Sequence, residues 1–253
     1  MPLLKTTAIV LSSRKWGEAD RLVTCYTRTL GKIRGVARGA RRQKSRFGAA
    51  LEPFTLCHLD LFEKTGDPLF RMSHVDVLTS HHELREDLKL MGAAARLVNV
   101  VGAVTPERDA DPQLFEILAQ GLSAVASSQD PLGTALLFQI KLLCRTGFRP
   151  QIDCCAACGR TPLAGTTHFL PTAGGLVCSV CATHHPACSL PLSQGSVAFL
   201  RQVVRLVPSL LVRLRADGRI RTEIEEAVDQ YVTVVAGRRL PPADFLSGSL
   251  SGR

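Results

Sequence analysis

Two pairs of cysteines in the second half of the chain place the strongest constraint on its fold. Cys155-x-x-Cys158 and Cys178-x-x-Cys181 are separated by the nineteen residues 159–177. Zinc prefers four ligands at tetrahedral corners, and a C-x-x-C turn brings two sulfurs to the same ion. We therefore predict that residues from about 153 to 189 form a zinc element with Cys155, Cys158, Cys178 and Cys181 as ligands.

The identity of each ligand has alternatives in the neighbouring sequence. Cys154 is adjacent to Cys155, and Cys188, His184 and His185 follow the second pair closely. Reduced cysteines in a loop, or two disulfides, are the other interpretations of the pattern. Four thiolates close the coordination shell of Zn²⁺, so we expect one structural ion per chain and no catalytic metal.

The chain has nine cysteines, and their odd number and metal-type spacing indicate a reducing compartment rather than a disulfide framework. The first residues alternate in polarity and do not resemble a signal peptide. The longest apolar stretch, residues 93–104, is interrupted by polar residues and is too short to span a bilayer. We expect a cytoplasmic protein that does not enter the membrane.

The first 79 residues have the period of short β-strands separated by glycine-containing turns. The predicted strands cover residues 3–13, 21–29, 32–38, 54–62 and 69–78. Five strands are enough for a small closed barrel, which would hide their edges. In the fourth strand the apolar phase shifts between Leu56 and Leu59, which predicts a bulge there.

The apolar period changes to about 3.6 residues at Ser80, where Ser80-x-x-Glu83 predicts a capping box. Its helix would bury one face, made of Leu84, Leu88, Met91, Ala95 and Val98. Further helices are predicted after Asp111-Pro112, after Asp130-Pro131 as far as Gly147, from Ser193, and after a second capping box, Thr222-x-x-Glu225.

These patterns predict an α+β multidomain protein. Residues 1–79 would form the β-barrel, and residues 80–253 a helical domain with the zinc element inserted in it. Residues 80–147 look like a three-helix unit, and the tail from Pro241 is rich in proline, serine and glycine and should be frayed.

Positive charge is concentrated at the front of the chain. Residues 1–79 hold 14 basic and 7 acidic residues, and residues 32–46 hold seven cations and no acid. Cations spaced along a strand and the loop after it can follow successive phosphates of a nucleic acid. The candidate DNA-binding residues are Lys32, Arg34, Arg38, Arg41, Arg42, Lys44 and Arg46, and the alternative is a solvated basic loop.

Aromatic residues near this segment are candidates for stacking on bases. Trp16 and Phe47 lie beside glycine or loop residues, whereas Tyr26 fits a core position better. A later series of arginines either extends the binding surface or pairs with neighbouring acids on the last helices. These arginines are Arg201, Arg205, Arg213, Arg215, Arg219 and Arg221.

Together these segments resemble the RecO family of bacterial recombinational DNA repair proteins. The resemblance rests on segments 8–11, 17–21, 27–32, 37–41 and 51–54, and on Cys155-x-x-Cys158-Gly159 followed by Gly174-Gly175-Leu176-Val177-Cys178-x-x-Cys181. It covers residues 1 to about 185. It implies an N-terminal OB-fold, a helical domain and a zinc element.

The resemblance also implies a non-enzymatic recombination mediator that binds single- and double-stranded DNA and anneals complementary strands without ATP. Family members work with RecR, and often with RecF, to load RecA on strands covered by single-strand DNA-binding protein. Two alternatives remain at this point. One is a zinc-ribbon scaffold that binds only protein. The other is a zinc-dependent enzyme acting on nucleic acid. His81-x-Glu83 matches the first half of a deaminase pattern, but the second half fails because Cys154, and not a proline, precedes Cys155.

Overall fold

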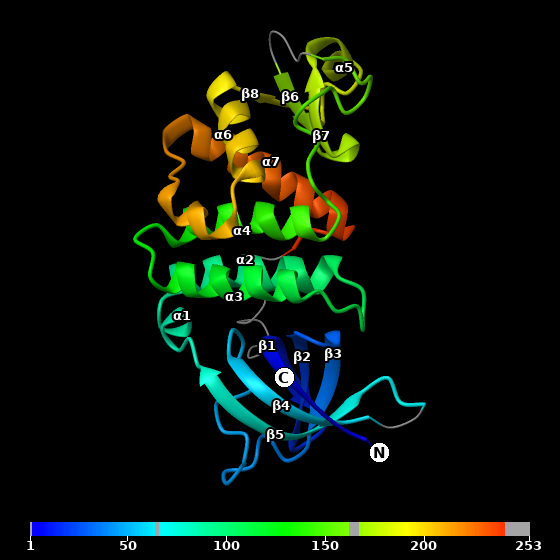
Figure 1. Cartoon of the computed structure of the whole chain (residues 1–253), viewed down its shortest axis with the longest axis vertical. Coiled ribbons are helices and arrows are strands. Elements are labelled where there is room, and N and C mark those ends of the chain that lie inside the picture. The colour runs from blue at the N-terminus through cyan, green and yellow to red at the C-terminus, as the bar shows by residue number, and fades with distance from the viewer. Residues whose placement is uncertain (1, 64–65, 162–166, 241–253) are drawn as a thin grey trace. The chain divides into compact units, whose positions relative to one another are not determined.

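The structure is a computed structural model that describes residues 2–63, 66–161 and 167–240 (Figure 1). The described residues as far as Pro131 form one compact unit, and Leu132–Leu240 form a second. The change from strand to helix falls between Thr79 and Glu83, well before the division between the two units. The predicted frayed tail from Pro241 lies outside the described residues.

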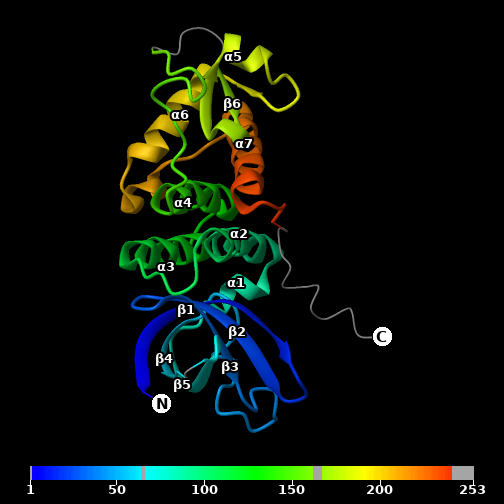
Figure 2. The ribbon, with the colours of Figure 1, turned by 90° about the vertical axis from the view of Figure 1, so that its right-hand side faces the viewer.

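The first unit begins with a closed five-stranded barrel (Figure 2). Its strands are β1 Leu3–Trp16, β2 Asp20–Thr27, β3 Gly31–Ala37, β4 Leu56–Phe62 and β5 Phe70–Thr79. The order around the barrel is β1-β2-β3-β5-β4, and β4 closes on β1. Neighbouring strands are antiparallel except β3 and β5, which are parallel. This is the predicted OB-fold, in which closure leaves no free sheet edge.

Alternation along the strands sends one set of apolar side chains into the barrel. On β4, Cys57, Leu59 and Leu61 are buried in this core, and the loop before β4 adds Phe47 and Leu51. Loops usually run over the surface of a protein. The segment between β3 and β4 differs, because the burial of Phe47 and Leu51 anchors its C-terminal part to the barrel.

The predicted irregularity between Leu56 and Leu59 is present in the β4–β5 ladder, but the extra residue is on β5 and not on the fourth strand. The alternation on β4 is regular, and its ladder with β5 shifts register between Leu56 and Cys57 and between Asp60 and Leu61, opposite the extra residues Leu78 and Ser73. A separate shift in the β1–β2 ladder leaves Leu11 as an extra residue on β1. The apparent phase shift arose because Phe54 is buried from the turn before β4, where its backbone has φ 74°.

Three helices complete the first unit: α1 Glu83–Glu86, α2 Leu88–Val104 and α3 Pro112–Ala126. The predicted capping box at Ser80 does not form, since no side chain caps α1. This helix is one short turn, and the chain leaves it at Asp87. The Asp87 carboxylate accepts hydrogen bonds from the backbone N–H groups of Lys89 and Leu90 and caps α2 instead. Leu88 is 72% exposed, so it is not part of the buried face.

The helix α3 begins as predicted. Asp111 accepts from the N–H groups of Gln113 and Leu114, and Pro112 occupies the first turn. The helices α2 and α3 pack against each other, and α2 also contacts β1 (Figure 1). The loop between the two helices, residues 105–111, pairs with β3 and ties them to the barrel.

The second unit contains α4 Pro131–Arg145, α6 Gln194–Arg205 and α7 Gly218–Ala236, with two 3-10 turns, η1 Pro171–Ala173 and η2 Pro208–Arg213. Between α4 and α6 lies a small antiparallel sheet of order β7-β6-β8, with the short helix α5 Ser179–Thr183. Its strands are β6 Thr167–Leu170, β7 Gly175–Cys178 and β8 Leu190–Leu192.

The boundaries of the helices in this unit follow the sequence with one exception. α4 begins at Pro131, and Ser193 caps α6 by accepting from the N–H of Ser196. The predicted cap at Thr222 is wrong, because α7 begins a turn earlier and Thr222 donates to the carbonyl of Gly218 inside the helix. In the described parts of the chain, no helix has the length and apolar character needed to cross a membrane.

Candidate metal centre and nucleic-acid interface

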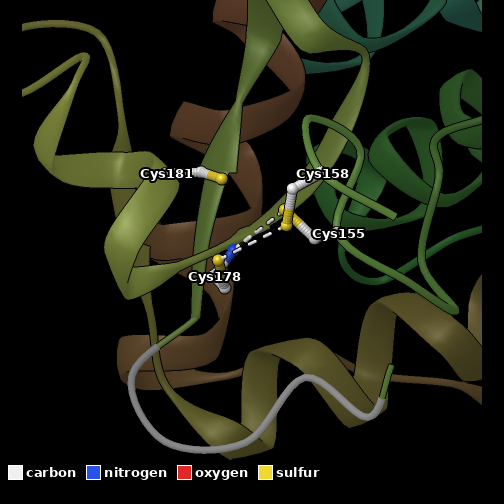
Figure 3. A group of neighbouring side chains, drawn as sticks. All are labelled: Cys155, Cys158, Cys178 and Cys181. Atoms are coloured by element: carbon white, nitrogen blue, oxygen red, sulfur yellow. Dashed lines mark hydrogen bonds between the residues drawn. The ribbon is translucent and has the colours of Figure 1, made fainter. Parts of the chain in front are cut away.

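The four predicted cysteine ligands come together in the second unit. The sulfurs of Cys155, Cys158, Cys178 and Cys181 all lie within 4.8 Å of one another, and the Cys158 and Cys178 sulfurs are 4.0 Å apart. Figure 3 shows the two pairs facing each other, with their sulfur atoms turned toward a common centre. A tetrahedral ion with metal–sulfur bonds of about 2.3 Å requires sulfurs about 3.8 Å apart. The separations therefore fit a four-thiolate metal site.

Close backbone contacts hold the two cysteine turns in place. Cys155 donates from its N–H to the carbonyl of Arg160 at 3.0 Å, and Gly159, with φ 73°, donates to the carbonyl of Cys155 at 2.8 Å. At Gly175 a Cβ would lie 2.4 Å from the carbonyl oxygen of Gln151, so only glycine fits there. The second pair spans the end of β7 and the first turn of α5.

The thiols of this cluster differ in their affinity for protons. Burial disfavours the Cys155 thiolate, but N–H groups, including that of Cys178 at 3.4 Å from its sulfur, outweigh burial and lower its pKa to about 6. Hydrogen bonds with the sulfurs of Cys158 and Cys178 raise the pKa of Cys181 to about 12. Neighbouring thiolates repel each other, so without a cation the group resists losing all its protons.

The alternative ligands lie outside this cluster. Among the described residues, the geometry selects Cys155 rather than Cys154, and it includes neither Cys188 nor the two histidines His184 and His185. The set is closed by four thiolates and leaves no coordination position for a substrate. A structural metal site is what this arrangement can provide.

The cations of the basic segment, residues 32–46, fall into two groups. Those of the first group bind other residues of the first unit. The Lys32 ammonium donates to the carbonyl oxygens of Gly102, at 2.8 Å, and Thr105 at the end of α2. Burial lowers the pKa of Lys32, an effect that Glu107 partly offsets and Arg34 reinforces. This cation caps the C-terminus of a helix, so it is not available to a phosphate.

Arg34 is also engaged within the first unit. Its Nε lies 2.8 Å from Oε1 of Glu107, in the loop that pairs with β3. The same loop approaches Gly31 so closely that a Cβ there would lie 2.2 Å from the carbonyl oxygen of Asp109. In the strand part of the predicted DNA-binding set, Lys32 is therefore bound to the end of α2, and Arg34 is paired with Glu107 while its side chain stays 40% exposed.

The second group lies on the loop that follows β3, which we call the basic loop, residues 38–46. Its cations Arg38, Arg41, Arg42, Lys44 and Arg46 are exposed. Arg46 has its guanidinium 5.0 Å from the ring centroid of buried Phe47. No ion pair with a carboxylate is found for these five cations in the described ranges.

The basic loop is held on the turn between β1 and β2. Arg41 donates from its backbone N–H to the carbonyl of Ala19 at 2.9 Å and from its guanidinium to the carbonyl of Glu18 at 2.8 Å. Gly39 donates its N–H to the Asp20 carboxylate at 2.8 Å. These contacts fix one end of the loop and leave the other cations directed to water or to a partner.

The three aromatic candidates have different environments. Tyr26 is fully buried, and its hydroxyl oxygen accepts a hydrogen bond from the N–H of Asp111 at 3.2 Å. Phe47 belongs to the barrel core, so the prediction that it stacks on bases is wrong. Trp16, at the end of β1, is 44% exposed.

The late arginines are mostly paired within the second unit. Four of them have acceptors, namely Arg201 with the carbonyl of Ile152, Arg205 with Asp153, Arg219 with Glu223 and Arg221 with Glu225. Arg213 and Arg215 are exposed, and the described ranges offer them no ion pair. The predicted pairing with acids on the last helices therefore accounts for two of the six, Arg219 and Arg221, while Arg201 and Arg205 bind residues 152 and 153 instead.

Comparisons with known proteins agree with both parts of the fold. The family model described as "Recombination protein O N terminal" matches residues 1–81, and "Recombination protein O C terminal" matches residues 85–242. The chain is similar to the DNA repair protein RecO of Symbiobacterium thermophilum, with 32% identity over 256 residues and the whole of both chains.

Two further relatives are similar to the chain over all or most of its length. DNA repair protein RecO of Rubrobacter xylanophilus is 33% identical over 260 residues, again covering both chains completely. The protein of that name from Syntrophobacter fumaroxidans is 35% identical over 217 residues, or 85% of each chain. The similarity thus extends through the barrel, the helices and the cysteine element.

Proposed function

The chain belongs to the RecO family of DNA repair proteins, and we propose on this premise that it is a recombination mediator that works without catalysis. It binds single- and double-stranded DNA and anneals complementary strands without ATP. With RecR, and with RecF where present, it helps to load RecA on DNA covered by single-strand DNA-binding protein. The proposal implies that the protein acts in the cytoplasm, on the nucleoid.

The observation that supports direct DNA binding is the exposed basic loop on the barrel. Five cations that have no carboxylate partner among the described residues lie in nine residues, on the loop between β3 and β4. In an OB-fold the face of strands 2 and 3 and the loops between strands 1–2 and 4–5 bind oligonucleotides, and the basic loop is attached to the first of these loops through Ala19 and Glu18. We assign DNA binding to residues 1–79, and within them to the basic loop rather than to Lys32 and Arg34.

Annealing follows from charge screening in this proposal. Two complementary strands repel each other, and a protein that neutralises phosphates on each reduces that repulsion and releases counterions. Arg213 and Arg215 in the second unit are candidates for a second contact. Neither a nucleophile nor a metal-bound water is needed for such a step.

The residues of the cysteine cluster fit Zn²⁺ as a structural ion. Cys155, Cys158, Cys178 and Cys181 would hold it, and the bound ion would stabilise the fold around β6, β7 and α5 without taking part in chemistry. Metal analysis of the purified protein should give one zinc per chain. A chain that is fully folded with no bound metal would contradict this assignment.

The decisive experiment is annealing of two labelled complementary strands over a salt series, with no nucleotide present. DNA binding is measured in the same salt series. Five phosphate contacts on a single strand predict a slope of about −3.5 for the logarithm of the binding constant against the logarithm of the salt concentration, since each contact contributes about −0.7. The triple variant Arg38→Ala, Arg42→Ala and Lys44→Ala should flatten the slope by about 2 and weaken binding equally for all sequences. Lys89→Ala removes an exposed cation outside the loop and serves as the control.

The possible results separate the proposal from its alternative. Wild-type affinity and slope in the triple variant would remove the basic loop from the binding site. Complete absence of DNA binding at low salt would leave only a protein-binding scaffold. Binding without annealing would contradict the mediator step and leave a DNA-binding loader that depends on its partner.

A further inference from the structure

Trp16 is the only tryptophan of the chain, and the protein leaves it in solvent. Among the aromatic residues that the structure describes, it is the one in the exposed class, whereas Tyr26, Phe47, Phe54 and Phe70 of the barrel are all at most 3% exposed. A tryptophan side chain is large and apolar, and most aromatic side chains contribute their area to a core or an interface. In the first unit this one stays 44% exposed.

Cations precede Trp16 on β1, and the turn after it carries the exposed carboxylate of Glu18. Arg14 and Lys15, which precede it on β1, are also exposed. Across the hairpin Trp16 pairs with Asp20, whose carboxylate is the acceptor for the N–H of Gly39 at the start of the basic loop. The indole therefore stands on the hairpin that anchors the basic loop, with cations before it on β1 and on that loop.

The combination of an exposed indole and flanking cations matches the chemistry of a single-stranded nucleic acid. Its phosphates are attracted by cations, and each unpaired base has two flat faces that stack on aromatic rings. In a duplex those faces are already covered by neighbouring base pairs. A ring beside the cations thus adds affinity for single strands only, while the cations serve both forms.

We propose that Trp16 is a stacking platform for an unpaired base and that it adds affinity for single strands that duplex DNA does not share. The inference rests on the proposed function, because it places a base beside phosphates bound by Arg14, Lys15 and the basic loop. Stacking of one base on an aromatic side chain typically corresponds to a change in affinity of about five- to a hundredfold.

Since Trp16 is the sole tryptophan, its fluorescence reports on this one position. The full-length protein is titrated with oligothymidylate, while a labelled copy of the same oligonucleotide reports binding independently through its anisotropy. We expect the tryptophan emission to be quenched in step with the anisotropy. A duplex of equal length should bind with much less quenching.

Variants test the energetic side of the proposal. Trp16→Ala should lose at least about fivefold in affinity for oligothymidylate and stay within about twofold of wild type for the duplex, whereas Trp16→Phe should recover part of the loss. Leu88→Ala removes another exposed apolar side chain of the same unit and should change neither affinity. Thermal melts of all variants establish that they are folded.

The possible results distinguish a failure of the Trp16 proposal from a failure of the proposed function. Anisotropy that reports binding while the emission and the Trp16→Ala affinity stay unchanged overturns the stacking platform and leaves DNA binding intact. An equal loss for single strands and duplex in a folded Trp16→Ala also overturns it. No binding by anisotropy at low salt refutes the proposed function itself.

Discussion

Lys32 and Lys44 lie in the same basic segment, but the Lys32 ammonium binds the end of α2 whereas Lys44 is exposed, and Lys32→Met tests this difference. The Lys32 ammonium caps the C-terminus of α2 through the carbonyls of Gly102 and Thr105. Methionine keeps most of the aliphatic stem and removes the charge and its donors. We expect Lys32→Met to destabilise the first unit and to leave DNA binding unchanged.

The size of the effect follows from the two hydrogen bonds. A hydrogen bond from a charged donor contributes about 1.5–3 kcal/mol, and the two carbonyls regain some water when the ammonium is removed, so we expect a loss of about 2–4 kcal/mol in the free energy of unfolding. For a unit of this size, about 4 °C of melting temperature is lost per kcal/mol. The melting temperature should therefore fall by about 8–16 °C.

Thermal melts by circular dichroism measure the stability, and DNA binding of the folded variant is measured at 20 °C over a salt series. The salt slope should equal that of the wild type. The control, Lys44→Met, should have an unchanged melting temperature and a slope flatter by about 0.7. A Lys32→Met protein that melts like wild type but has the flatter slope would refute the assignment of Lys32 to the helix cap.

Three further substitutions test other parts of the structure. Cys178→Ser, or chelation of the metal, should lower the melting temperature of the second unit by more than 10 °C, since structural zinc contributes on the order of 10 kcal/mol in small modules; an unchanged melt after verified zinc removal would contradict a structural role. Burial opposes the charge of Glu223, but hydrogen bonds from Ser196, Ser193 and Arg219 outweigh it and lower its pKa to about 2, so its carboxylate stabilises the fold above pH 4.5 and loses this effect as the pH falls toward 2. Measured by urea unfolding, the free energy of unfolding should fall on acidification by about 3 kcal/mol more in wild type than in Glu223→Gln. Equal pH profiles of the two proteins would rule this out. Gly31→Ala should cost about 3 kcal/mol or more because of its φ of 68° and the contact with Asp109, whereas Gly17→Ala, with φ 56° and open space, should cost only about 1–2 kcal/mol; equal denaturant midpoints would show that the contact is absent.

Signals that act over a few residues predicted much of the fold. Alternating apolar residues identified all five barrel strands, with each end within three residues of the observed one, and the Asp111-Pro112 and Ser193 caps marked the starts of two helices. The spacing of the four cysteines identified the cysteine cluster. These features depend on local backbone geometry, which the neighbouring residues determine.

Local signals were insufficient where a tertiary contact competed with them. Ser80 and Glu83 have the spacing of a capping box, but the chain turns away at Asp87 and the helix cap forms there. The three short strands of the cysteine element were not predicted, because each has only three or four residues and depends on pairing with the others. A short strand has little pattern of its own.

Residue patterns were sufficient to predict a five-stranded barrel, helices, a cluster of four cysteines and a run of seven cations. The tertiary structure decided which of those cations are available to a partner. Lys32 meets its acceptor Gly102 from 70 positions away along the chain, and Arg34 meets Glu107 in the same way. Side chains of one type are equivalent in a sequence pattern, and only the fold determines which of them are desolvated and paired and which remain in water.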